Sequence, residues 1–257
     1  MKSSITKIKN KKGKTPIVVL TAYSKSVSKI LDKYCDIILV GDSLANVLYG
    51  MKSTHDVTLE MMIKHGLSVK LGAKKTLCVV DMPKNTYKNL KTAKANAKKI
   101  IKRTKCDAVK IESNGRNHLI IKGLVKSKIP VMGHIGYTPQ FKKNFKVAGF
   151  SAIEEKKLIS EAINIEKAGA FSIVLECIVS KTSKKITNAI KIPTIGIGSS
   201  INCDGQVLVT DDMLGLSGFK PKFVKKYTSL NKIIKNIIQK YKKEVIKKMF
   251  PNKSNSF

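Results

Sequence analysis

The 257-residue chain has no tryptophan and only two arginines, Arg103 and Arg116, although it holds 50 lysines and arginines against 17 aspartates and glutamates. A net charge of +33 is typical of proteins that bind polyanions. Arginine, however, is the side chain that grips phosphates and reads bases, and the lysines here are spread along the chain instead of forming one stripe. We therefore interpret the charge as a generally basic, solvated surface and expect no specific nucleic-acid partner.

Long apolar runs are also lacking. No stretch approaches the ~18 uninterrupted apolar residues that a membrane span needs, so we expect no membrane segment. No apolar segment follows the basic residues 1–14, as it would in a signal peptide. The five cysteines are odd in number and form no CxxC pair, which is typical of free thiols in a reducing compartment. A cytoplasmic protein is expected.

Short apolar runs alternate with longer amphipathic segments along the chain. The predicted strands are rich in valine and isoleucine and mostly lack period-2 alternation, as do strands buried on both faces of a parallel sheet. They span residues 16–21, 36–41, 76–80, 108–111, 130–133, 172–175, 194–198 and 206–209. The predicted helices span residues 24–34, 59–71, 90–102, 117–126, 151–167, 181–190 and 230–249.

Eight strands, most of them followed by a helix, in a chain of this length favour a TIM (β/α)8 barrel of the α/β class. An open doubly wound sheet is the alternative, because the number of strands alone does not show closure. We interpret the basic amphipathic helix 230–249 as the eighth barrel helix and not as a membrane-surface helix. No change of composition marks a linker. Residues 1–257 are therefore predicted to form a single domain, with a basic N-terminal segment 1–14 and a polar tail 251–257.

Ionisable side chains stand at the carboxyl ends of five consecutive predicted strands. In strand order they are Asp42 and Asp81 after the second and third strands, Lys110 and Glu112 around the end of the fourth, His134 after the fifth and Glu176 at the end of the sixth. In a barrel these strand ends form one rim, where barrel enzymes keep their chemistry. Converging carboxylates are hard oxygen ligands that suit Mg²⁺ or Mn²⁺ better than zinc. The group as a whole predicts a metal-dependent active site.

Other polar features carry less weight. Three histidines lie in predicted loops or helices with no visible partner, and we interpret them as surface or packing residues. They are His55, His65 and His118. The segment GIGSS, residues 196–200, resembles a phosphate-binding loop, but a lone GxG is weak, and contact with a substrate or cofactor stays open. The long connections 44–58 and 136–151 are typical of active-site lids or subunit contacts.

Several segments resemble the ketopantoate hydroxymethyltransferase (3-methyl-2-oxobutanoate hydroxymethyltransferase) family over about residues 15–227. In family order they are LTAYS, LVGDSL, VVDMP, AVKIE, PVMGHIGYTPQ, VLECI, IPTIGIGSS, CDGQVLV and DDMLGLSG. The resemblance implies a TIM barrel that transfers a hydroxymethyl group from 5,10-methylenetetrahydrofolate to 3-methyl-2-oxobutanoate. The product is 2-dehydropantoate, in pantothenate biosynthesis. The resemblance also implies a homo-oligomer, decameric in bacterial relatives, although +33 charges per chain oppose close packing.

Roles for the rim residues are implied by the same resemblance. The metal ligands are Asp42, Asp81 and Glu112, which would bind one Mg²⁺ per subunit. The substrate contacts are Asp42, Ser43, Asp81, Lys110 and, as a polar contact of unassigned role, His134. The proton acceptor is Glu176. The chemistry of these residues agrees, because a 2-keto acid can chelate Mg²⁺, which acidifies the C3 hydrogen for removal by a carboxylate and stabilises the resulting enolate.

The sequence departs from the family pattern at several positions. Ser24 follows Tyr23 where the family has aspartate, Ala45 replaces the glycine after GDSL, and Lys84 replaces an apolar residue after DMP. KVAGF, residues 146–150, replaces a KVQGK-like stretch. Lys84 and the altered stretch bear on folate access and lid closure. Two alternatives remain open: another Mg²⁺-dependent 2-keto-acid enzyme of the isocitrate lyase and phosphoenolpyruvate mutase type, whose catalytic cysteine loop we do not find, and a basic polyanion-binding scaffold.

Overall fold

A closed barrel of eight parallel strands forms the centre of the first compact unit, Met1–Val209, in the computed structural model of the chain. The structure describes residues 2–142, 144–218 and 221–257. The strands are β1 (Ile17–Thr21), β2 (Ile37–Val40), β3 (Leu77–Asp81), β4 (Ala108–Glu112), β5 (Val131–Gly136), β6 (Ser172–Glu176), β7 (Thr194–Ile197) and β8 (Gly205–Leu208). They pair in chain order, and β1 closes the barrel on β8. The predicted TIM barrel is confirmed, and the sheet is not open.

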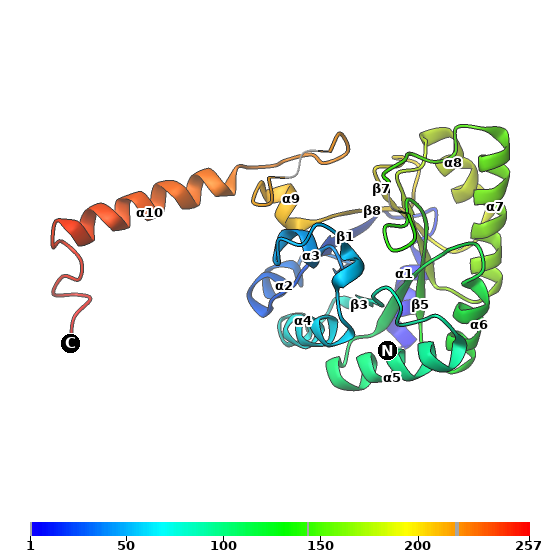
Figure 1. The fold of residues 1–257 in the computed structure, drawn as a ribbon, viewed down its shortest axis with the longest axis horizontal. Helices are drawn as coiled ribbons and strands as arrows, with labels where there is room; N and C mark the ends of the chain where they lie inside the picture. Colours follow the sequence, from blue (N-terminus) through cyan, green and yellow to red (C-terminus); the bar gives the residue numbers. More distant parts are fainter. Residues whose placement is uncertain (1, 143, 219–220) are drawn as a thin grey trace. The chain divides into compact units, whose positions relative to one another are not determined.

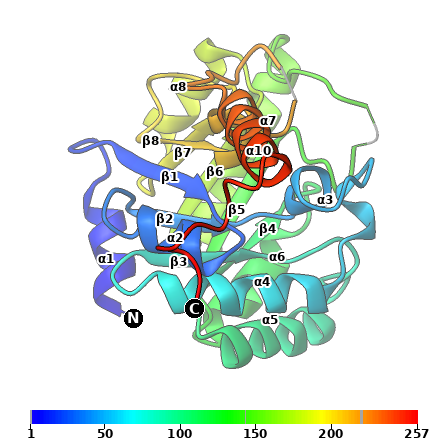
Figure 2. The same ribbon diagram turned by 90° about the vertical axis from the view of Figure 1, so that its left-hand side faces the viewer.

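Helices cover the outside of the strands (Figure 1). The helices of the first unit are α1 (Lys2–Asn10), α2 (Lys25–Leu31), α3 (Leu44–Val47), the 3₁₀ helix η1 (Thr54–Asp56), α4 (Leu59–Gly72), α5 (Leu90–Thr104), α6 (His118–Lys126), α7 (Ala152–Lys167) and α8 (Ser180–Ala189). Helix α4 packs on β2 and β3, α5 packs on β4, and the two helices lie side by side (Figure 2). The sequence did not predict α1, α3 or η1.

The interior of the barrel is divided into an apolar part and a polar part. On β3, Leu77 belongs to a buried apolar cluster contributed by the strands, and Asp81 lies four residues further on. On β4, Ala108 belongs to the same cluster, and Lys110 and Glu112 follow at intervals of two. Residues two apart on a strand face the same side of a sheet. The charged side chains therefore continue the interior stripe of the barrel at its carboxyl end.

The basic N-terminal segment is folded against the other end of the barrel. Ile8 of α1 is buried in the apolar cluster that the strands form. After the helix, Nζ of Lys12 lies 2.8 Å from Oδ2 of Asp204, and the backbone N–H of Gly13 donates to Oδ1 of the same side chain at 2.9 Å. These contacts anchor the segment beside the start of β8.

Several strands extend further toward their carboxyl ends than predicted. Asp81 and Glu112 are the last residues of β3 and β4, and His134 lies inside β5 instead of following it. The register pairs Glu112 with His134 and Gly136 with Glu176. The prediction ended these strands just before Asp81, Glu112 and His134, whereas side chains that face the barrel interior leave the backbone free to continue its ladder of hydrogen bonds.

The second compact unit, Thr210–Phe257, contains α9 (Thr210–Leu214) and α10 (Leu230–Ile246). The predicted helix 230–249 is therefore present. No residue of α10 is buried, and its assignment as the eighth barrel helix stays a prediction. The single-domain organisation stays a prediction. Among the residues that the structure describes, no helix is both long and apolar enough to cross a membrane.

Candidate active site

Two aspartates from neighbouring strands lie in contact at the carboxyl end of the barrel. Asp81 ends β3, and Asp42 follows β2 after Gly41. The backbone N–H of Asp42 donates to Oδ2 of Asp81 at 3.1 Å, and both residues are buried. A Cβ at Gly41 would lie 2.7 Å from Oγ of Ser43, so a larger residue at this turn would force the Ser43 side chain to shift. The turn directs Asp42 toward Asp81.

A buried lysine faces this pair of aspartates. Nζ of Lys110 lies 2.8 Å from Oδ1 of Asp81, and the two side chains are 6% and 3% exposed. Burial lowers the pKa of Lys110, but the negative charges of Asp81 and Asp42 outweigh it and raise the pKa above its ordinary value. Lys110 is therefore a permanent cation inside the barrel.

The acids carry more negative charge than the lysine balances. Burial is the main cause that raises the pKa of Asp42 to about 7, and repulsion by Asp81 is the next. Burial, and then repulsion by Asp42, raise the pKa of Glu112 well above its ordinary value. Oε1 of Glu112 is buried and has no hydrogen-bond partner in the described part of the chain. Buried, unpaired carboxylate oxygens are costly unless a cation accompanies them.

The donors fit a hard divalent cation in their chemistry. Three buried carboxylates converge, and one of their oxygens, Oε1 of Glu112, lacks a partner among the described residues. These carboxylates do not by themselves form a complete metal coordination sphere. Among residues 2–142, 144–218 and 221–257, no three His, Cys, Asp or Glu side chains are grouped closely enough to hold one metal ion. The predicted ligands are thus neighbours, and one oxygen of Asp81 is held by Lys110.

His134 lies between two carboxylates. Its Nε2 is 3.1 Å from Oε2 of Glu176, and its Nδ1 is 3.7 Å from Oε1 of Glu112. Both ring nitrogens are buried, and neither is oriented for a hydrogen bond to the described residues. Burial is the strongest influence on the ring and lowers the pKa of His134, although Glu176 opposes the change. The imidazole is therefore neutral at neutral pH.

Glu176 is more accessible than the other acids. Its side chain is 20% exposed, whereas those of Asp81 and Glu112 are 3% and 1% exposed. Glu176 ends β6, and the next residue, Cys177, has φ 50°, a left-handed conformation that is uncommon outside glycine. The sharp change of backbone direction leaves Glu176 at the edge of the buried group.

Ser43 lies beside Asp42 but also contacts another loop. Its Oγ is 2.9 Å from the hydroxyl of Tyr23, and Ser43 is half-buried at the start of α3. Nδ1 of His65 is in turn 2.7 Å from the carbonyl oxygen of Tyr23, and its Nε2 is 3.0 Å from the hydroxyl of Tyr49. The partners of His65 were not visible in the sequence because they are distant along the chain, and the residue is partly buried, as expected of a packing residue.

Two buried residues of the site were missed by the sequence analysis. Gln140 lies in the connection between β5 and α7, and its side-chain Nε2 donates to Oδ2 of Asp42 at 2.8 Å. Tyr87, in the connection between β3 and α5, donates to Oε1 of Gln140 at 2.5 Å. The only sequence signal for Gln140 was its place in the TPQ motif, and that motif indicated no role for the glutamine.

Three connections meet at His55, which the sequence analysis also left without a partner. Nε2 of His55 is 2.8 Å from the carbonyl oxygen of Pro139, so the histidine contacts the connection that holds Gln140. Nζ of Lys84 is 3.0 Å from Nδ1 of His55. Lys84, one of the departures from the family pattern, therefore participates in the contact between these connections.

The GIGSS segment ties two connections together in the described structure. Oγ of Ser199 donates to the carbonyl oxygen of Leu175 at 2.7 Å and accepts from the N–H of Ile178 at 3.2 Å. Oγ of Ser200 is 2.9 Å from Oγ of Ser180. Both hydroxyls thus join the end of β7 to the end of β6. Contact with a substrate or cofactor stays a prediction.

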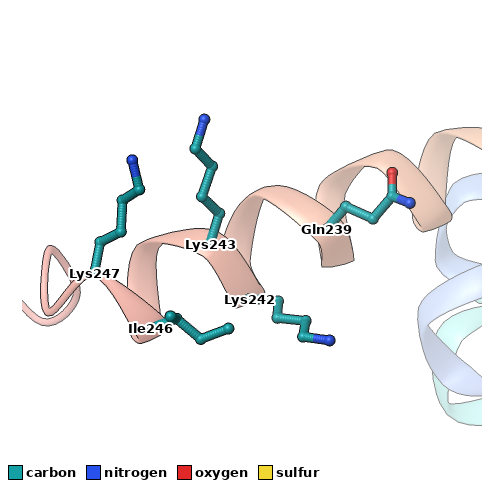
Figure 3. Close-up of a pocket in the computed structure, with 5 residues that line it drawn as sticks. All are labelled: Gln239, Lys242, Lys243, Ile246 and Lys247. Atoms are coloured by element: carbon teal, nitrogen blue, oxygen red, sulfur yellow. The ribbon is translucent and has the colours of Figure 1, made fainter.

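A hollow lies along α10. Figure 3 shows its five lining residues, all from one helix: Gln239, Lys242, Lys243, Ile246 and Lys247. None of them is acidic, and none is a histidine or cysteine. The hollow offers none of the groups expected of a catalytic centre.

The closed barrel and its buried charged rim define a (β/α)8-barrel enzyme. The sequence model of the family described as ketopantoate hydroxymethyltransferase matches residues 2–253. The chain belongs to this family and is a transferase.

Curated relatives support this assignment along the whole chain. A 3-methyl-2-oxobutanoate hydroxymethyltransferase of Pelagibacter ubique is 53% identical over 257 residues and is covered completely, as is this chain. A relative of the same name from Rhizobium etli is 46% identical over 251 residues, which cover 96% of this chain and 92% of the relative. The 3-methyl-2-oxobutanoate hydroxymethyltransferase 2 of Zymomonas mobilis is 44% identical, with coverage of 99% and 94%.

Solved structures resemble the fold but not the sequence. A complex of phosphonopyruvate hydrolase with oxalate and Mg²⁺ has a TM-score of 0.65 at 8% identity, covering 98% of this chain and 93% of the other. A 2,3-dimethylmalate lyase, described as a member of the PEP mutase/isocitrate lyase superfamily, has a TM-score of 0.63 at 12% identity, covering 98% and 88%. These similarities support the barrel fold alone.

Proposed function

We propose that the chain transfers a hydroxymethyl group from 5,10-methylenetetrahydrofolate to 3-methyl-2-oxobutanoate and so forms 2-dehydropantoate for pantothenate biosynthesis. The observation that carries the proposal is the buried group of carboxylates around Lys110 and His134 at the carboxyl end of the barrel. Family membership supplies the substrate class, because the curated relatives are named for the 3-methyl-2-oxobutanoate reaction.

The proposed metal ligands are Asp42, Asp81 and Glu112, which would bind one Mg²⁺. When bound, the cation would withdraw electron density from the keto oxygen of the substrate and acidify its C3 hydrogen. The unpartnered Oε1 of Glu112 and the raised pKa of Asp42 support this assignment, because both reflect uncompensated negative charge.

Glu176 is proposed to take the C3 proton as general base. Its side chain is the most exposed of the carboxylates in the group, so a substrate can reach it. The imidazole of His134 lies 3.1 Å from one oxygen of Glu176 and carries no positive charge, because burial lowers its pKa. Proton removal leaves an enolate on the substrate.

Lys110 is proposed to offset the charge of the substrate carboxylate and of the enolate, and Ser43 to donate a hydrogen bond to the substrate. The permanent charge of Lys110 follows from the acids around it, which raise its pKa. C3 of the enolate then forms a bond to the methylene carbon of the folate, whose two bonds to the folate nitrogens are both broken in the course of the reaction. The net reaction consumes one water, which supplies the hydroxyl oxygen, and releases tetrahydrofolate.

The two alternatives receive less support. The isocitrate lyase and phosphoenolpyruvate mutase group is similar in fold only, with 8% identity to the phosphonopyruvate hydrolase complex and 13% to a 2,3-dimethylmalate lyase. A polyanion-binding scaffold gives no reason for a buried cluster of three acids, one lysine and one histidine.

A homo-oligomer, decameric by resemblance, and a cytoplasmic location belong to the same proposal. The free state of all five cysteines supports that location.

The test is product formation by the purified full-length chain. With 3-methyl-2-oxobutanoate, Mg²⁺ and 5,10-methylenetetrahydrofolate, mass spectrometry is expected to detect 2-dehydropantoate. Omission of folate, addition of a chelator, or Asp42→Asn is expected to abolish the product. Product that forms without folate would contradict the proposal. So would the absence of product when folded protein is given 3-methyl-2-oxobutanoate, Mg²⁺ and 5,10-methylenetetrahydrofolate together.

A further inference from the structure

We propose that Gln140 is a positioning residue that holds Asp42 and Glu112 in the arrangement that binds the divalent cation, and that Tyr87 fixes the orientation of its amide. This inference rests on the proposed function, because Asp42 and Glu112 are metal ligands proposed there.

Gln140 contacts both acids at once. Its backbone N–H donates to Oε2 of Glu112 at 3.0 Å, and its side-chain Nε2 donates to Oδ2 of Asp42 at 2.8 Å. The same Nε2 donates to the carbonyl oxygen of Met82 at 3.0 Å. Gln140 is only 1% exposed, so water does not compete for these donors. One residue thus links the acid that follows β2 to the acid that ends β4.

The amide of Gln140 has one orientation that satisfies its neighbours. The hydroxyl of Tyr87 donates to Oε1, while the carbonyl oxygen of Met82 accepts from Nε2. A flipped amide would place its oxygen against two acceptors, the carbonyl oxygen of Met82 and Oδ2 of Asp42, and would lose the hydrogen bond that the hydroxyl of Tyr87 donates to Oε1. Both side-chain donors of Nε2 and the acceptor Oε1 are therefore assigned to fixed partners. Tyr87 is 3% exposed, so its own position is set by packing.

The contacts leave oxygen atoms for another ligand. Gln140 engages one oxygen of each acid, Oδ2 of Asp42 and Oε2 of Glu112. The second oxygen of Glu112, Oε1, has no hydrogen-bond partner among the described residues. Carboxylates that bind metals are usually oriented by hydrogen bonds of this kind, and loss of such a partner costs about 10–100-fold in metal affinity or activity.

The connection that carries Gln140 is itself held in place. The carbonyl oxygen of Thr138 accepts from the N–H groups of Phe141 and Lys142, each at 2.9 Å, which forms a tight turn around Gln140. Thr138 is buried, and the carbonyl oxygen of Pro139 contacts His55. The turn presents the backbone and the side chain of Gln140 to the acids together.

Two substitutions separate the amide from the rest of the residue. Gln140→Met keeps the length of the side chain and the backbone N–H but removes the amide. Gln140→Asn keeps the amide but shortens its reach by one methylene. Gln239→Met is the matched control, because Gln239 is exposed on α10 and loses the same amide. Tyr87→Phe removes only the hydroxyl that orients Oε1.

Isothermal titration of the metal-free full chain with MgCl₂ is the readout. Gln140→Met and Gln140→Asn are expected to raise the Kd for Mg²⁺ by about 10–100-fold, and Gln239→Met to leave it unchanged. Tyr87→Phe is expected to weaken binding in the wild-type background and to have no further effect beside Gln140→Met. High Mg²⁺ is expected to restore turnover to the Gln140 variants, which a folding defect would not allow.

The possible failures are distinguishable. No saturable Mg²⁺ binding by folded wild-type protein would overturn the proposed metal site itself. Wild-type binding with an unchanged Kd in both Gln140 variants would overturn the positioning role and leave the proposed function intact. Additive effects of Tyr87→Phe and Gln140→Met would overturn the role of Tyr87. If circular dichroism shows that Gln140→Met does not fold, the Kd values of Gln140→Asn and Tyr87→Phe for Mg²⁺ still decide whether Gln140 has the positioning role.

Discussion

Asp42→Asn is expected to stabilise the metal-free protein at pH 8 and at the same time to abolish its activity. Burial, and next the proximity of Asp81, raise the pKa of Asp42 to about 7 from an ordinary value of 3.8. This difference corresponds to about 4 kcal/mol. Because the folded-state pKa is the higher one, the stability linked to this carboxyl is present below about pH 4 and is lost as the pH rises through about 7. Asparagine does not ionise and avoids the loss.

Urea unfolding followed by circular dichroism, in chelator, measures this effect. Asp42→Asn is expected to raise the free energy of unfolding relative to wild type by about 4 kcal/mol at pH 8 and by less than about 2 kcal/mol at pH 5. Asp56→Asn, at an exposed aspartate, is the matched control and is expected to show no such pH-dependent gain. A variant that is no more stable than wild type at pH 8 would refute the argument that uncompensated charge is buried at Asp42.

Three further substitutions test other parts of the site. Glu176→Gln is expected to lower kcat by about 10²–10⁴-fold while Mg²⁺ affinity in a calorimetric titration is kept; a parallel loss of metal binding would contradict a proton-transfer role. Lys110→Met leaves its buried carboxylate partner unpaired, so urea unfolding is expected to show a loss of about 3–5 kcal/mol; unchanged stability would contradict the buried pair. Lys84→Met removes the 3.0 Å contact with His55, and chymotrypsin is expected to cleave the native protein several-fold faster near exposed Phe145; an unchanged rate would show that this contact does not restrain the connection.

The barrel could be predicted because most of its strands are buried on both faces. Runs such as IILV before Gly41 are apolar on successive residues, and this composition is specific to parallel sheets covered by helices. The same reliance on apolar composition placed the end of β5 too early, just before His134. A strand that faces a polar barrel interior continues past such a polar residue. Helix α1 was also missed, because its sequence is rich in lysine and, among the side chains of the helix that the structure describes, Ile8 is buried.

The acids of the site could be predicted because strand order fixes where strand ends meet. Asp42, Asp81 and Glu112 each follow or end a recognisable strand. Partners in connecting segments could not be predicted, because no periodicity fixes the path of a loop. Gln140 is 98 residues from Asp42 along the chain, and His55 is 84 residues from its partner Pro139. Only the folded chain brings such pairs together.

The central claim is that the charged rim removes the C3 proton of 3-methyl-2-oxobutanoate and passes the enolate to a folate-borne carbon. The most direct test is proton NMR of this keto acid in D₂O with the purified full-length chain and Mg²⁺, before and after addition of 5,10-methylenetetrahydrofolate. The account predicts loss of the C3 proton signal before folate is added and a hydroxymethyl product only afterwards. An unchanged C3 signal, from protein shown to be folded and saturated with Mg²⁺, would contradict it.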